Sequence, residues 1–122
     1  GERGGHESIN MALSVLPKDV QFVTFLNGDN KLRPTYIEDM YNPEADIPTC
    51  MVKMNDIPGI VLTGETFSRR SIDRLNYAIR ADLAVQVRHK MHIDSDCDYV
   101  IDCASIAENP IHHVEKILAE HN

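Results

Sequence analysis

The chain has 122 residues, of which 43% are hydrophobic and 25% are charged, and its formal net charge is −7. This length fits one domain with a real core, and the composition excludes a chain that is disordered throughout. The acidic balance argues against a general nucleic-acid coat protein, and no apolar run approaches the roughly 18 residues that cross a bilayer.

The first ten residues, GERGGHESIN, are polar and glycine-rich, and Met11 follows them directly. We therefore expect residues 1–10 to be a flexible tail or an expression remnant, and residues 11–122 to form a single domain. The apolar stretch MALSVL is too short for the central part of a signal peptide.

The three cysteines, Cys50, Cys97 and Cys103, are odd in number and lack the paired spacing of a disulfide framework or a zinc knuckle. Thiols of this kind are typical of a reducing compartment. We expect a cytoplasmic protein.

The segment PKDVQFVTFLNGDNKLRP is typical of a hairpin, because the turn residues 27–30 follow an apolar strand at 22–26. Both faces of that strand are apolar, so we expect it to be central. Next, TYIEDMYNP predicts a helix of one or two turns. Thr35 and Glu38 fit a capping box there, and Pro43 ends the helix.

A second hairpin is predicted where TCMVKMN and GIVLT flank DIPG, with Pro58 and Gly59 in the turn. From 68 to about 82 the apolar residues recur at steps of three and four, which predicts an amphipathic helix. Its buried residues would be Ile72, Leu75, Ile79 and Leu83.

Residues 83–93 can continue this helix or form a strand, and the alternating valines Val85 and Val87 favour the strand. A turn at 94–98 and a partner strand at 99–106 would follow. Asn109 and Pro110 then suit the N-cap and first position of a last helix. Its buried stripe would be Ile111, Val114, Ile117 and Leu118.

This order of elements indicates an α+β fold. We expect a small single domain in which an antiparallel sheet, built from two or three hairpins, carries two main helices on one face.

One stretch, TGETFSRRSIDR at 63–74, suggests an anion or partner site, because arginines gather where the helix at 68–82 would begin. On a helical wheel the arginines and one tyrosine share an arc, opposite the apolar stripe. The candidate residues are Gly64, Ser68, Arg69, Arg70, Arg74, Tyr77 and Arg80.

Three interpretations of this basic face stay open. Residues 69–90 sum to +4 and the remainder to −11, so the arginines could be solvated or paired within the chain, which is the simplest interpretation. They could also contact a protein or acidic ligand, or a nucleic acid through stacking and phosphate contacts. The pattern of a P-loop is absent.

Asp94, Asp96 and Asp98 could bind a hard cation, and divalent-metal-dependent hydrolysis there is an alternative function. The pattern is no EF-hand, because Tyr99 stands where glycine should bend the loop, and three aspartates also suit a tight turn. His89, His92 and Cys97 lack the spacing of a zinc site. We expect no metal and no cofactor.

The leading hypothesis is a small, cytosolic, non-enzymatic protein that binds a protein partner through a charge-segregated surface. It could form a homodimer or another homo-oligomer, and an accessory protein of a virus or mobile element would fit this description. A nucleic-acid or phosphoryl-ligand module that uses the arginine-rich helix is the alternative.

Overall fold

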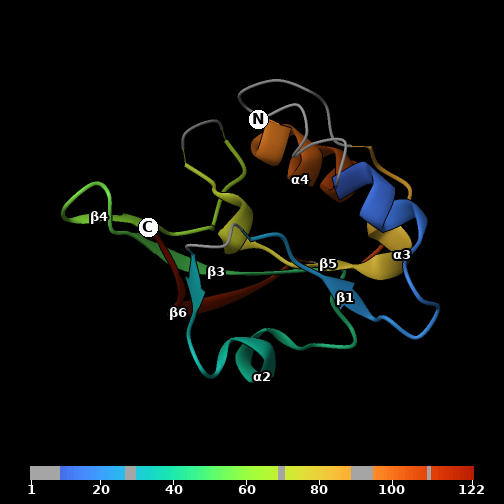
Figure 1. The fold of residues 1–122 in the computed structure, drawn as a ribbon. Coiled ribbons are helices and arrows are strands. Elements are labelled where there is room, and N and C mark those ends of the chain that lie inside the picture. Colours follow the sequence, from blue (N-terminus) through green and yellow to red (C-terminus); the bar gives the residue numbers. More distant parts are fainter. Residues whose placement is uncertain (1–8, 27–29, 69–70, 89–94, 110) are drawn as a thin grey trace.

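The structure, a computed structural model, describes residues 9–26, 30–68, 71–88, 95–109 and 111–122. Its centre is a four-stranded sheet in the order β2-β6-β3-β4 (Figure 1). The strands are β2 (Lys31–Leu32), β3 (Ile47–Met54), β4 (Ile60–Leu62) and β6 (Ile111–His121). β2 with β6 and β3 with β4 are antiparallel, whereas β3 and β6 run parallel.

Two further short strands form a separate two-stranded sheet. β1 (Phe22–Val23) pairs antiparallel with β5 (Ile79–Arg80). The β5 segment in turn lies along the first half of β3, because the amide of Arg80 donates to the carbonyl of Asp46 at 2.8 Å. β4 takes the corresponding place along the second half of β3.

Helices lie on both sides of the sheet. A helical segment at 9–14, α3 (Ala81–Ala84) and α4 (Ser95–Ile106) lie on one side, and α2 (Tyr36–Met40) lies on the other (Figure 1). A short 3-10 helix, η1 (Arg74–Asn76), precedes β5. The two helices that share a side, α3 and α4, are not the two main helices that the sequence predicts at 68–82 and after Asn109.

The buried side chains form two clusters. The larger one joins α3, α4 and β5, and it includes Ile47, Tyr77, Ile79, Leu83 and Val100. The smaller one includes Tyr36 and Met40 of α2 with Val52, Leu75 and Leu118. Full burial of a side chain of this size contributes about 1.5–3 kcal/mol, so the two clusters hold the helices to the sheet.

Three of the predictions are confirmed. The fold is of the α+β class in one domain, and α2 forms where TYIEDMYNP predicts a short helix. The second hairpin is β3–β4, and Gly59 in its turn has φ +79°. The capping box is wrong, because Thr35 makes no side-chain hydrogen bond to α2.

The first predicted hairpin is wrong. β1 and β2 do not pair with each other, because β1 pairs with β5 and β2 with β6. The expected central strand at 22–26 is thus a two-residue strand of the separate two-stranded sheet. Part of its predicted turn, residues 27–29, lies outside the described residues.

The helix predicted at 68–82 is also wrong, although its inward positions are correct. Ile72, Leu75, Ile79 and Leu83 are all buried. The described backbone passes instead through η1, β5 and the start of α3. Residues 75 to 79 are buried without interruption, and an amphipathic helix cannot bury five successive residues.

The last two elements are exchanged relative to the prediction. The turn at 94–98 and the strand at 99–106 are both replaced by α4. Cys97, Val100, Cys103 and Ala107 recur at steps of three and four, which is the signal that predicts this helix correctly. The aspartates of its first turn suit the positive end of the helix dipole.

The predicted final helix is the strand β6, which pairs along most of β3. Thr49 pairs with His113 but Met51 with Ile117, and Val52 pairs with Ala119, so β6 carries extra residues at two irregularities. Bulges break the two-residue alternation of a strand. The apolar residues of β6 therefore fall at spacings that resemble those of a helix.

Two further expectations concern segments that lie partly outside the described residues. The strand favoured for 83–93 is wrong where it is described, since 81–84 are helical and 85–88 form no strand. Residues 89–94 lie outside the described residues. Within the expected tail, Ile9 and Asn10 begin the helical segment, and Ile9 packs against the larger cluster.

Candidate functional site

The predicted anion site does not form as one surface. Gly64 follows β4 with φ +75°, and it is buried against the carbonyl of Cys50. Tyr77 is fully buried in the larger core cluster, so it cannot stack on a ligand. Ser68 is exposed, and its carbonyl accepts a hydrogen bond from Ser71 Oγ at 2.8 Å.

Arg80 is paired within the chain, as the simplest interpretation of the basic face holds. Its Nε donates to Asp46 Oδ1 at 3.0 Å, and its Nη2 donates to the carbonyls of Ala45, at 3.1 Å, and Pro43. The guanidinium also lies over the ring of Phe22 at 5.3 Å. Arg80 thus joins β5 to the residues before β3.

Of the remaining arginines of the predicted site, the structure describes only Arg74. Arg74 lies in η1, whose N-cap is Asp73. Arg69 and Arg70 lie outside the described residues. The described residues 71–80 do not form the single helix that would align Arg74 with Arg80, so the helical face proposed for a nucleic-acid module does not form there.

The predicted metal ligands are placed only in part. Asp94, His89 and His92 lie outside the described residues. Asp98 lies in the first turns of α4, and Cys97 is buried in the core. Among the described residues, no three histidine, cysteine or acidic side chains lie close enough together to hold a metal ion.

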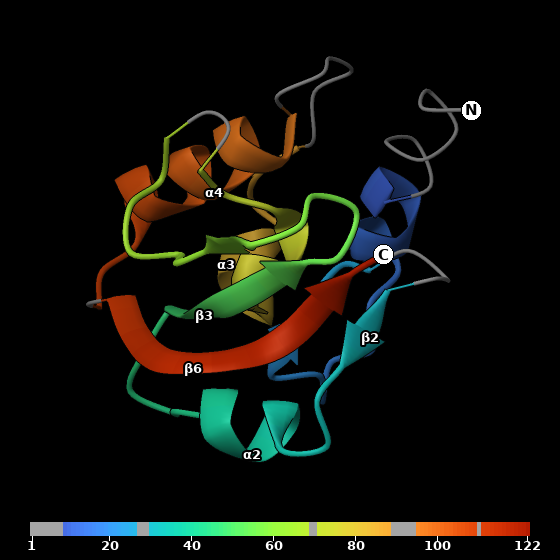
Figure 2. The same ribbon diagram turned by 90° about the vertical axis from the view of Figure 1, so that its left-hand side faces the viewer.

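A different site lies on the part of the four-stranded sheet that no described helix covers. In Figure 2, β4, β3 and β6 lie side by side, with helices above, below and behind them and none in front. One cross-strand row, Lys31–Glu120–Lys53–Val61, points to the exposed face, since paired residues share a face. The next row, Leu32–Ala119–Val52–Leu62, points inward, and its two central residues are fully buried.

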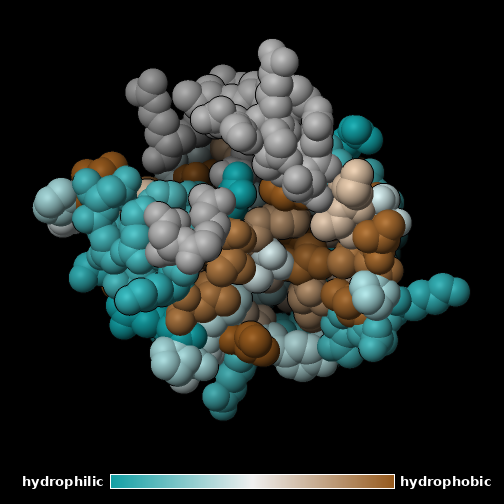
Figure 3. Space-filling model, in the orientation of Figure 1, coloured by the Kyte–Doolittle hydropathy of each residue, from teal (hydrophilic) through white to brown (hydrophobic). Residues whose placement is uncertain are grey.

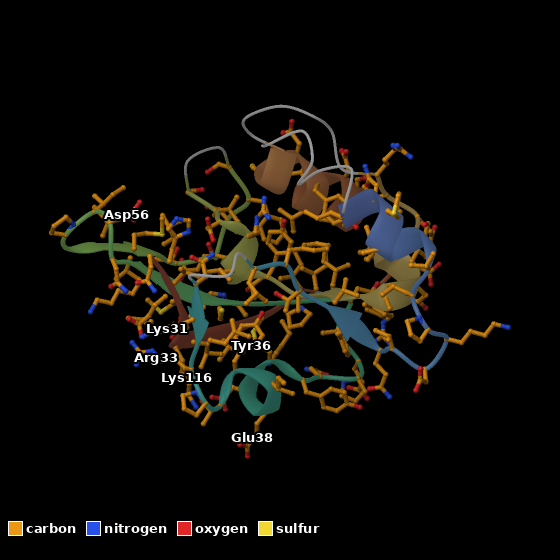
Figure 4. All side chains as sticks on the ribbon, in the orientation of Figure 1. Lys31, Arg33, Tyr36, Glu38, Asp56 and Lys116 are labelled. Carbon is orange, nitrogen blue, oxygen red and sulfur yellow. The ribbon has the colours of Figure 1, made fainter. Side chains whose placement is uncertain are left out.

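Four cations gather around this open face. We call them the basic cluster: Lys31, Arg33, Lys53 and Lys116. All four are exposed, and Lys31, Arg33 and Lys116 extend from the same end of the molecule (Figure 4). Arg33 Nε lies 3.1 Å from Glu120 Oε2 and Lys116 Nζ lies 3.5 Å from Asp39 Oδ1.

The pKa of Glu120 is lowered by its surroundings, which include cations of this cluster. A hydrogen bond from Asn55 Nδ2 at 3.0 Å is the largest cause that holds the pKa of Glu120 below its ordinary value of 4.5. The positive charges of Arg33, Lys53 and Lys31 lower the pKa further and outweigh a partial loss of hydration. Glu120 therefore remains ionised among three cations.

A groove of about 510 Å³ runs beside these cations. Arg33 and Lys53 line it, together with the apolar side chains of Met54, Ile60, Val61 and Ile117. Ile60 and Val61 are exposed although they are apolar, at 42% and 38%. We call this feature the basic groove, since cations border an apolar floor.

The basic cluster differs in sign from the rest of the molecule. Its four cations face two carboxylates, Glu120 and Asp39, so the cluster and its partners carry +2. The whole chain carries −7, and the remaining residues therefore carry −9. This cluster is not the basic segment at 69–90 that the sequence singles out.

Sequence patterns do not reveal this site. The four cations come from β2, the residue after it, β3 and β6, which are far apart in the chain. Only the pairing of β6 with both β2 and β3 brings them together. Once the strands are known, the alternation of Lys31, Arg33 and Lys53 with apolar neighbours is the available signal.

Comparisons with known proteins add no assignment. No protein-family model matches the chain, and no curated protein shows significant similarity to it. None of the helices in the described part of the chain is long and apolar enough to cross a bilayer.

Proposed function

We propose that the chain is a small non-enzymatic binding protein that holds an acidic protein partner in the basic groove. One observation carries the proposal: in an acidic chain, two exposed cations of the basic cluster, Arg33 and Lys53, line a groove together with apolar side chains, of which Ile60 and Val61 are exposed. An acidic partner would be attracted by this cluster and repelled by the remaining surface, which fixes its orientation.

The composition of the groove supports a protein rather than a free anion as the partner. Protein interfaces combine an apolar centre with a polar rim. Val61, Ile60 and Ile117 offer the centre, and Arg33 and Lys53 offer the rim. An inorganic anion would use the cations but would leave the apolar floor in contact with water.

A second copy of this chain is a weaker candidate for the groove. In a two-fold dimer built on this face, the basic cluster of one copy would oppose the same cluster of the other. Like charges placed opposite each other cost several kcal/mol at an interface. The partner is therefore a different, acidic protein, and the homodimer is an outcome that the experiment below can detect.

We also place the protein in the cytoplasm. Cys50, Cys97 and Cys103 are all free and buried in the core. Buried free thiols persist without pairing in a reducing compartment. Fractionation of source cells with an antibody to the chain tests this location.

The test of the groove is capture of partners from source-cell lysate on immobilised protein, after nuclease treatment. Three proteins are compared: the natural chain, the double variant Arg33→Glu/Lys53→Glu, and the matched control Lys18→Glu, whose lysine is exposed before β1. We expect one acidic protein to bind the natural chain and the control. Charge reversal in the groove should weaken its binding at least tenfold.

Three results would contradict the proposal. Equal capture by the natural chain and the Arg33→Glu/Lys53→Glu variant would show that the groove is not the binding site. Capture that nuclease abolishes would point to nucleic acid, with binding that falls steeply with salt. Self-association of the natural chain that charge reversal abolishes would identify a homodimer instead.

A further inference from the structure

A second pocket, of about 310 Å³, lies between β1 and α2. Figure 3 shows a hollow with hydrophobic residues around it in this part of the molecule. Phe22 and Val23 of β1 form one wall, and Tyr36, Met40 and Tyr41 form another. Pockets that bind small molecules begin at about this volume and have walls of this composition.

The aromatic rings and the thioether in the walls determine which shape of ligand fits this pocket. The rings of Phe22 and Tyr41 meet edge to face, with their centroids 5.9 Å apart. Arg80 lies over the ring of Phe22 and is itself bound to Asp46, so this wall is held in place. Met40 offers a sulfur that packs well against aromatic ligands. A planar apolar ligand fits these surfaces, and no charged side chain lines the pocket.

Three residues of the lining carry hydroxyl groups: Thr24, Tyr36 and Tyr41. Those of Thr24 and Tyr36 bond to each other, and the chemistry of their partners fixes the direction of each hydrogen bond. Thr24 Oγ1 lies 3.2 Å from the carbonyl oxygen of Tyr77, which can only accept, so the Thr24 proton is used there. Tyr36 Oη lies 3.1 Å from Thr24 Oγ1 and must therefore donate to it. Both protons are committed, and only acceptor lone pairs remain.

We propose that this pocket binds a small planar apolar molecule with one hydrogen-bond donor, which donates to the hydroxyl oxygen of Tyr36. At the Thr24–Tyr36 pair, a ligand with only an acceptor would find no free proton and would lose its own hydrogen bond to water. Burial raises the pKa of Tyr36 above its ordinary value, so the hydroxyl stays neutral and the bond pattern does not change with pH in the ordinary range. This site is separate from the basic groove, and the two proposals fail or succeed independently.

Phenol and toluene are the matched probes, because they differ by a hydroxyl in place of a methyl group. Their dissociation constants are measured by NMR titration of the full chain, followed at the methyl groups of Met40 and Val23. Because toluene is the more hydrophobic ligand, the informative quantity is the ratio of the toluene constant to the phenol constant. This ratio is compared between the natural chain and variants of the two hydroxyl residues.

The double variant Thr24→Val/Tyr36→Phe removes both hydroxyls and leaves the apolar walls. We expect the ratio to fall about three- to tenfold, which is the net value of one hydrogen bond. Ile57→Ser, at an exposed apolar residue outside the pocket, should leave the ratio unchanged. An unchanged ratio in the double variant, or titrations in which neither probe shifts the Met40 and Val23 methyls, would overturn the proposal.

A single variant gives a second, opposite readout. Thr24→Val frees the proton of Tyr36, so an acceptor-only ligand should gain a partner. We expect anisole to bind about three- to tenfold better, relative to ethylbenzene, in Thr24→Val than in the natural chain. The absence of this gain would show that the hydroxyl pair does not face the ligand and would overturn the assignment of Tyr36.

Discussion

Gly64 and Asn76 pack together where the second hairpin contacts the residues that follow it. A side-chain β-carbon on Gly64 would collide with the carbonyl oxygen of Cys50 and would lie 3.0 Å from Asn76 Nδ2. Asn76 is fully buried, and its Nδ2 donates to the carbonyls of Cys50 at 2.8 Å and Leu62 at 3.1 Å. The amide of Asn76 thus links β3 to β4 through the space that glycine leaves open.

Gly64→Ala should therefore destabilise the protein by roughly 2–4 kcal/mol, because left-handed backbone strain adds to a collision with main chain. Gly59→Ala is the matched control. Gly59 also has a positive φ, +79°, but no atom lies within 4 Å of its added carbon. Gly59→Ala should lower the free energy of unfolding by only about 1–2 kcal/mol. Urea unfolding of both variants measures the difference, and equal losses would contradict the close packing at Gly64.

The residues of the predicted anion site show why chemistry cannot be read from residue type alone. Arginine beside tyrosine suggests a surface for stacking, but Tyr77 is in the core and Arg80 is bound to Asp46. The sequence contains the acidic partner of Arg80, 34 residues earlier. Only the fold shows that the two side chains meet.

At the scale of elements, Asp46 connects the end of α4 to the start of β3. Its Oδ2 accepts from the amides of Glu108 at 3.0 Å and Asn109 at 3.1 Å, and its Oδ1 accepts from Asn109 Nδ2 and Arg80 Nε. Burial alone would raise the pKa of Asp46. The hydrogen bonds outweigh it and hold the pKa below the ordinary value of 3.8.

Asp46→Asn should cost about 1–3 kcal/mol at neutral pH, because a buried carboxylate loses charge-assisted hydrogen bonds. The sign of the pH effect follows from the lowered pKa. The folded state binds fewer protons at this group, so its stabilisation is complete above about pH 4 and is lost as the pH falls through the folded pKa. Between pH 6 and pH 2, the free energy of unfolding should fall less in Asp46→Asn than in the natural chain.

The matched control for this position is Asp82→Asn. Asp82 is exposed in α3, and it lines a surface pocket together with Asp46 and Arg80. Surface changes of this kind usually stay within about 0.5 kcal/mol. If Asp82→Asn lowered the free energy of unfolding by as much as Asp46→Asn does, the negative charge of the region, rather than the hydrogen bonds of Asp46, would stabilise the fold.

β6 is the element that most changes the expected architecture. As a strand it pairs with β2 on one side and β3 on the other, so the chain end completes the centre of the sheet. The pairing with β3 is parallel and joins residues more than 60 positions apart. Short apolar segments have no strong preference of their own, and such tertiary pairing decides between helix and strand.

At the scale of the whole molecule, the three thiols are distributed over both core clusters. Cys50 lies in the smaller cluster, and Cys97 and Cys103 lie in the larger one. Burial raises the pKa of Cys50 and of Cys103 to about 12, so neither is a thiolate at neutral pH. Their reactivity should therefore report opening of the core, because only the thiolate reacts.

We expect the native protein to react with a thiol reagent such as Ellman's reagent at pH 8 only as fast as it opens. All three thiols should react at once in concentrated denaturant. The native rate should rise in Gly64→Ala in proportion to its loss of stability, which links this prediction to the unfolding measurement. A thiol that reacts in the native state at the rate of a free cysteine would contradict the burial of the cysteines.

The sequence by itself determined the class of the fold, the β3–β4 hairpin, the short helix α2 and the inward positions Ile72, Leu75, Ile79 and Leu83. These features depend on composition, turn residues and apolar spacing, which are local. Only the tertiary structure decided that β6 is a strand and α4 a helix, and where the cations gather. Strand pairing and core burial act between residues far apart in the chain, so the basic cluster exists only after β2, β3 and β6 have met.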